Sequence, residues 1–144
     1  MTKKQVNAYI WEWQEILRLD EWEVLVKSNE TNVVRDEGDD VAASARTEFN
    51  EARCYLHVAR DYPDDELKSY IRHELLHLSL AEMRNLLEKA IEAMGPEAAK
   101  LFEELMLTAE ERTVYRLDRA LTKILEKQTI DADKMPKRRA KKKT

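Results

Sequence analysis

The stretch Tyr70-Ile71-Arg72-His73-Glu74-Leu75-Leu76-His77-Leu78-Ser79-Leu80 decides how the rest of the chain is interpreted. It contains the pattern HExxH. On an α-helix, residues four apart lie on the same face, so the imidazoles of His73 and His77 can bind one metal ion. Glu74 follows the first histidine directly and lies within reach of a water held by that ion. We therefore expect a helix that carries two metal ligands and a general base.

Zinc is the metal that these residue types favour. Neutral imidazole suits Zn²⁺, and a catalytic zinc has three protein ligands and leaves its fourth position to water. The alternative is a coincidence, in which Glu74 is an ordinary helix former. However, the chain has only three histidines, and two of them flank this glutamate in an apolar stretch, where unpaired charge is costly. We expect one zinc ion per chain, although Mn²⁺, Co²⁺ and Ni²⁺ also accept imidazole and carboxylate ligands.

The composition is that of one domain in a reducing compartment. The 144 residues are 43% hydrophobic and 38% charged, with no apolar run long enough to cross a bilayer. The N-terminus lacks the apolar segment of a signal peptide, and the single cysteine, Cys54, excludes an internal disulfide. With two glycines, the chain has no glycine-rich phosphate-binding loop. We expect a cytoplasmic protein without membrane contact or nucleotide chemistry.

The first part of the chain is predicted to form a helix and three strands. Apolar residues recur at intervals of three and four over residues 4–18, which predicts an amphipathic helix. Alternating apolar residues predict strands over 22–27, 41–49 and 53–60, the last two as a hairpin. Residues 28–40 are mostly polar and are predicted to form a loop.

Two reactive side chains lie on the third predicted strand. Cys54 alternates with Leu56 and Val58 on its apolar side, so we expect a core residue rather than a nucleophile. His57 points to the other side and has no companion at ligand spacing. It is predicted to be a surface residue.

Two long helices are predicted to follow. The first covers residues 66–94, is capped by Asp64 or Asp65, and has apolar residues on several sides, as a buried helix does. Gly95-Pro96 ends it and begins the second, over 97–127, with a possible kink near Thr108. Four residues are expected to mark the buried face of the second helix: Leu117, Leu121, Ile124 and Leu125.

Together these elements predict the α+β class: an N-terminal helix, a small, mostly antiparallel three-stranded sheet, the HExxH helix and a C-terminal helix. Residues 1–128 form the single domain, and 129–144 are predicted to be a disordered basic tail. The net charge is −4, yet Lys134 to Thr144 carry seven Lys or Arg residues. Such a tail binds phosphates weakly and without sequence choice, and it lacks interleaved aromatic residues. Nucleic acid is therefore not expected to be the main partner.

A third metal ligand must come from outside the motif. No histidine follows it, and residue 83, where a third histidine would stand in one class of HExxH proteins, is Met. A helix packing antiparallel on the HExxH helix can bring a carboxylate, which leaves Glu110 and Glu111 as candidates. Glu110 lies on a predicted buried stripe, together with Phe102, Met106, Val114 and Leu117. Thr108 and Glu111 have the spacing of a capping box, if the helix restarts there.

The HExxH motif and the order of helix, strands, HExxH helix and glutamate helix resemble the gluzincin metallopeptidases. The match is with their minimal, single-domain type (minigluzincins) and with small zincin-like proteins of phages and prophages. The resemblance covers about residues 5–125 in architecture. It implies that His73 and His77 bind zinc, that Glu74 is the general base, and that a glutamate of the last helix is the third ligand. Spacing within gluzincin glutamate helices favours Glu111, with Glu110 as the alternative, although Tyr115 replaces the usual acid or amide.

The expected function is zinc-dependent hydrolysis of peptide bonds in a peptide or protein substrate. A zinc-activated water would attack the carbonyl, with Glu74 as the base. By resemblance, the strand over 53–60 would hold substrate by main-chain pairing. Tyr115, Tyr62 and His57 are candidates to stabilise the oxyanion. The competing expectation is a non-catalytic zinc-binding or partner-binding protein with the same fold.

Overall fold

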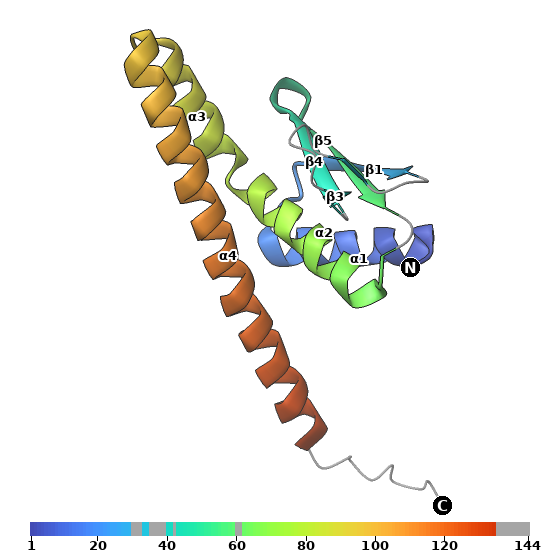
Figure 1. The fold of residues 1–144 in the computed structure, drawn as a ribbon. Helices are drawn as coiled ribbons and strands as arrows, with labels where there is room; N and C mark the ends of the chain where they lie inside the picture. Colours follow the sequence, from blue (N-terminus) through green and yellow to red (C-terminus); the bar gives the residue numbers. More distant parts are fainter. Residues whose placement is uncertain (30–32, 35–39, 42, 60–61, 135–144) are drawn as a thin grey trace, which may run out of the picture.

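The computed structural model describes residues 1–29, 33–34, 40–41, 43–59 and 62–134, and it confirms the α+β class (Figure 1). In the described residues, an N-terminal helix is followed by the strands and then by three helices. In order, the elements are α1 (Lys3–Leu17), β1 (Glu23–Asn29), β2 (Val33–Val34), β3 (Asp40–Val41), β4 (Ala43–Glu48), a 3₁₀ turn (Phe49–Glu51), β5 (Arg53–Ala59), α2 (Asp64–Ser79), α3 (Ala81–Glu92) and α4 (Pro96–Lys134).

Helix α1 begins and ends at recognisable local signals. Thr2 and Gln5 form a capping box at its start, which satisfies backbone N–H groups that have no partner in the helix. Arg18 adopts the left-handed conformation at its end. The residues at intervals of three and four that face the interior are Val6, Ile10 and Trp13. The predicted helix over residues 4–18 is confirmed.

The main sheet has the strand order β1-β5-β4, so β5 lies in the centre and β4 at an edge. β4 and β5 pair antiparallel, as the predicted hairpin requires, whereas β1 pairs parallel with β5. The sheet is therefore mixed rather than mostly antiparallel, because alternation of apolar residues does not encode strand direction. In the predicted loop over 28–40, β2 and β3 form a two-residue antiparallel ladder. The other residues of that loop beyond Asn29 lie outside the described part.

The core lies between one face of the sheet and helices α1 and α2. Cys54, Leu56 and Val58 alternate along β5 and are all buried, which confirms the predicted inner face. Ile71 and Leu75 of α2 pack against them with no exposed surface. Burial, together with the nearby Glu74, raises the pKa of the Cys54 thiol to about 12.

The predicted helix over residues 66–94 is in fact two helices. The chain leaves α2 at Leu80, where φ is −99° and ψ is 0°, and resumes as α3. The hydroxyl of Ser79 donates to the carbonyl of Leu76 at this junction, at 2.6 Å. No glycine or proline marks the break, so the sequence carries no signal for it. The N-cap is Pro63 without a side-chain hydrogen bond, not Asp64 or Asp65, and Asp64 instead pairs with the N-terminal amino group.

Helix α4 is longer and more continuous than predicted. The Thr108 hydroxyl donates to the Glu104 carbonyl at 2.9 Å within an unbroken helix, so there is no restart and no capping box at this point. The helix continues to Lys134, which makes 129–134 helical rather than part of a tail. The rest of the predicted tail, 135–144, lies outside the described residues. No helix in the described ranges is long and apolar enough to cross a membrane.

The buried face of α4 agrees with the prediction except at one leucine and one isoleucine. Met106, Glu110 and Val114 are buried, and Leu121 and Leu125 are partly buried against the core. By contrast, Leu117 and Ile124 are 38% and 52% exposed. Helix α4 lies along both α2 and α3 (Figure 1), so its buried residues are those that face these two helices.

The buried thiol predicts a pH dependence of stability. The pKa of Cys54 is about 12 in the folded protein and ~8.5 in an unfolded chain. At a pH between these two pKa values, unfolding therefore releases a proton from the thiol. The free energy of unfolding therefore falls as pH rises above the lower value. By about pH 10 the loss is roughly 2 kcal/mol.

The measurement is urea unfolding at about pH 7.5 and about pH 10, with Cys54→Ala as the control. The variant is less stable at both pH values because it has lost packing. Its free energy of unfolding should fall less between the two pH values, because it has no thiol to ionise. Equal decreases in the two proteins would contradict the assignment.

Candidate metal centre

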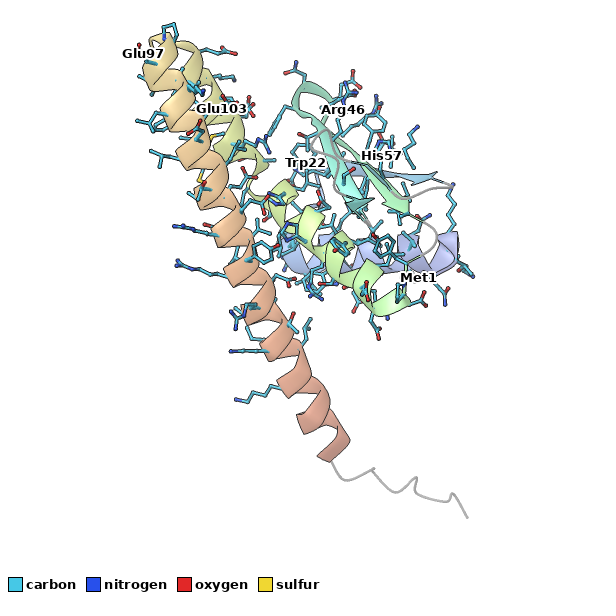
Figure 2. The ribbon with its side chains drawn as sticks, viewed as in Figure 1. Met1, Trp22, Arg46, His57, Glu97 and Glu103 are labelled. Atoms are coloured by element: carbon cyan, nitrogen blue, oxygen red, sulfur yellow. The ribbon has the colours of Figure 1, made fainter. Side chains whose placement is uncertain are left out.

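The two histidines of the motif and two glutamates of α4 meet where α2 and α4 pack against each other. His73 and His77 lie one turn apart on α2, with side chains 16% and 17% exposed. Their Nε2 atoms are 3.1 Å apart. Glu111 approaches both, with carboxylate oxygens 3.6 Å from Nε2 of His73 and 3.3 Å from Nε2 of His77. Side chains of the two helices fill the space between the ribbons in Figure 2.

These separations suit a tetrahedral zinc site. Two ligand atoms that each lie 2.0–2.1 Å from one zinc ion at tetrahedral angles are about 3.3–3.4 Å apart. The three measured separations, 3.1, 3.3 and 3.6 Å, lie on both sides of this value. One donor atom can be taken from each of His73, His77 and Glu111 such that all lie within 4.8 Å of one another. Two imidazoles and one carboxylate are also a donor set typical of catalytic zinc.

Glu110 occupies a different position from Glu111. Its Oε1 lies 2.7 Å from Nδ1 of His77, on the side of the ring that faces away from the other donors. The Glu110 side chain is 6% exposed, whereas that of Glu111 is 44% exposed. The predicted position of Glu110 on the buried face of the helix is confirmed. The geometry therefore groups Glu111 with the histidines and makes Glu110 the hydrogen-bond partner of His77.

The charges around His77 reinforce this arrangement. Burial acts to lower the pKa of His77, but the hydrogen bond to Glu110 and the charges of Glu111 and Glu74 outweigh it and raise the pKa. The same hydrogen bond lowers the pKa of Glu110 more than burial raises it, and Arg84 adds to the lowering. An ionised Glu110 accepts the Nδ1–H of His77 and leaves Nε2 available to bind a metal ion.

Glu74 lies on the side of α2 that faces the edge strand β4. The side chain is almost fully buried, at 5% exposure, and its Oε2 accepts a hydrogen bond of 3.0 Å from the backbone N–H of Ala45. This contact provides one of the hydrogen bonds that a buried carboxylate requires. Sequence reasoning did not anticipate Ala45, because no side chain is involved.

A cleft of about 300 Å³ lies between β4 and the helices. Glu74, His77, Glu110 and Glu111 line it, together with Ser44, Ala45 and Thr47 of β4 and Arg84 of α3. Arg84 comes within 3.8 Å of Glu110, a contact that sequence reasoning also missed. Because α3 departs from the line of α2 at Leu80, the position of Arg84 depends on a break that the sequence does not signal.

Only one of the three expected oxyanion candidates borders the metal-binding group. The ring of Tyr115 lies 5.2 Å from that of His73, at an angle of 60°. Tyr62 packs on Tyr70 instead. His57 lies on β5, on the sheet side of the molecule (Figure 2), paired in register with Ser44 and Lys27.

Comparison with known proteins gives no relative from which a role for this site could be inferred. No protein-family model matches the chain, and neither the curated proteins nor the solved structures include a match.

The two adjacent glutamates are expected to respond differently to mutation. Glu111→Gln removes a charged ligand and should weaken zinc binding by more than about 100-fold. Glu110→Gln weakens the hydrogen bond that orients His77. Loss of such a bond to a metal ligand typically lowers metal affinity by ~10–100-fold. The dissociation constants are measured by competition with a chromophoric chelator, with Glu104→Gln on the exposed side of α4 as the control. The reverse ranking would make Glu110 the ligand.

Proposed function

We propose that the protein is a zinc-dependent peptidase, with His73, His77 and Glu111 as the zinc ligands and Glu74 as the general base. The observation that carries this proposal is the meeting of three donors at separations that suit a tetrahedral metal site, beside a cleft that the Glu74 carboxylate lines. Glu111 reaches the two histidines of α2 from α4, 34 positions after His77. The resemblance to gluzincins and phage zincin-like proteins supports the same assignment. The lone cysteine supports a cytoplasmic location within this proposal.

The metal and the protein have separate tasks in the reaction. Zinc, when bound, supplies a Lewis acid that polarises the scissile carbonyl and acidifies water. Glu74 takes a proton from the attacking water and delivers it to the leaving amine. The hydrogen bond from Ala45 fixes the orientation of the Glu74 carboxylate at the cleft, so the general base is held in one position. We expect Tyr115, whose ring lies next to that of His73, to donate a hydrogen bond to the developing oxyanion.

The substrate is proposed to lie along β4, not along β5, at the edge where no other described strand pairs with β4. The strand over 53–60 was expected to hold substrate, but β5 is paired on both sides and has no free edge. β4 is at the edge and lines the cleft. The N–H of Ala45 points away from β5, towards Glu74. Main-chain groups two positions apart on a strand face the same side, so those of Ala43 and Thr47 also face this edge. Antiparallel pairing there would bind a peptide with little sequence selection.

A non-catalytic zinc protein is the competing proposal, and one observation favours it. The hydrogen bond from Ala45 gives Glu74 a structural task, because it ties β4 to α2. A glutamate kept only for this purpose would not need to abstract a proton. The two proposals differ in what happens when the carboxylate is replaced by an amide.

Replacement of Glu74 by Gln separates these proposals. Gln still accepts a hydrogen bond from Ala45 but cannot act as a base, so Glu74→Gln should bind zinc normally and lose about 10²–10⁴-fold in kcat. Cleavage of a quenched fluorescent peptide library by the zinc-loaded protein is the assay, with Glu66→Gln, at an exposed position of α2, as the control. Wild-type turnover by Glu74→Gln would refute the base assignment.

The role of Tyr115 is tested by removing its hydroxyl. Tyr115→Phe keeps the ring against His73 and loses the donor, so kcat should fall about 10²-fold while zinc affinity stays unchanged. Tyr62→Phe, away from His73, is the matched control. A loss of zinc affinity in Tyr115→Phe would instead assign the hydroxyl to support of the metal site.

A further inference from the structure

The third ligand depends on how α4 is placed on α2, and apolar contacts alone define this placement poorly. Val114 is fully buried on α4, and Met106 nearly so, but such contacts tolerate sliding and rotation. Neighbouring positions on a helix differ by about 100° in direction, and one turn is about 5.4 Å long. A small change in register would therefore move Glu111 away from both histidines.

One ion pair connects the two helices next to the metal centre. The guanidinium of Arg72 binds Asp118 through two hydrogen bonds, from Nε to Oδ1 and from Nη2 to Oδ2, the latter of 3.2 Å. The two side chains are only 14% and 18% exposed. A two-point contact between a planar guanidinium and a carboxylate restricts distance and orientation together. It is therefore suited to define the register of α4.

Arg72 is itself held in place by α1. Its guanidinium lies over the ring of Trp13, 5.5 Å from the centroid, and it interacts with the hydroxyl of Tyr9. Trp13 is 2% exposed and belongs to the core. The position of Arg72 is thus set by the body of the protein before α4 is considered.

The sequence positions of the pair match those of the metal-binding residues. Arg72 directly precedes His73 on α2. Asp118 lies two turns after Glu111 on α4 and on the same side of the helix. The two helices run antiparallel, since Arg72 meets Asp118 and His77 meets Glu110.

We propose that Arg72 and Asp118 are positioning residues, whose ion pair sets the register of α4 so that Glu111 reaches the metal held by His73 and His77. The proposal rests on the zinc site proposed above but not on peptidase activity. The pair contacts neither metal nor substrate and acts only through the place of Glu111.

The test measures zinc dissociation constants of the full chain by competition with a chromophoric chelator, together with thermal unfolding of the metal-free proteins. Asp118→Asn removes the charge with little change of shape and should weaken zinc binding about tenfold, the lower end of the effect of groups that orient metal ligands. Arg72→Lys keeps the charge but loses the two-point contact, and an intermediate loss is expected.

The control is Leu121→Ala, which reduces apolar packing of the same helix without touching the ion pair. It should lower the unfolding temperature at least as much as Asp118→Asn but leave zinc affinity within about twofold. The decisive comparison is a double-mutant cycle, because positioning of Glu111 has no effect once Glu111 is absent. In a Glu111→Ala background, Asp118→Asn should therefore cause no further loss of zinc affinity.

Three results would overturn the proposal: unchanged zinc affinity in both Asp118→Asn and Arg72→Lys, an equal loss in Leu121→Ala, or additive losses in the double-mutant cycle. A wild-type chain that binds no zinc would reject the metal site and the positioning role together. Zinc binding with the expected coupling but without peptide cleavage would reject the peptidase and leave the positioning role standing.

Discussion

The antiparallel packing of α4 on α2 is the contact on which the candidate site depends. α2 is held in the core by Ile71 and Leu75, which leaves its opposite side to meet α4. On that side, Val114 is completely buried while polar groups flank it on each side. The helix pair thus combines an apolar contact, which supplies burial, with polar contacts that restrict geometry. His73 and His77 would form an incomplete pair of ligands without this second helix.

The polar contacts also explain how charged side chains are tolerated in the interior. Glu74 and Glu110 are 5% and 7% exposed, and an isolated buried carboxylate would be costly. Each accepts a short hydrogen bond, from the N–H of Ala45 and from the imidazole of His77 respectively. These bonds connect the edge strand to α2 and α2 to α4. Groups that suit a metal centre therefore also hold together the elements that form its cleft.

Several features could be predicted from the sequence because they have local causes. The periodicity of α1 and the alternation along β5 depend on neighbouring residues only. Other features have no local cause. The parallel pairing of β1 with β5 and the break at Leu80 leave no composition signal. The periodicity of α4 correctly predicted a buried Glu110, but it gave no sign that Asp118 would pair with Arg72 of α2.

The sequence alone determined the helical spacing of His73 and His77, the neighbouring Glu74 and the restriction of the third ligand to one of two adjacent glutamates. Helical periodicity is a property of the chain itself, so these relations need no tertiary information. The resemblance to gluzincins favoured Glu111, but only the tertiary structure shows where each glutamate lies: Glu111 beside both Nε2 atoms, and Glu110 beside Nδ1 of His77. Adjacent residues on a helix point about 100° apart, and which of them faces a partner depends on how that partner is packed.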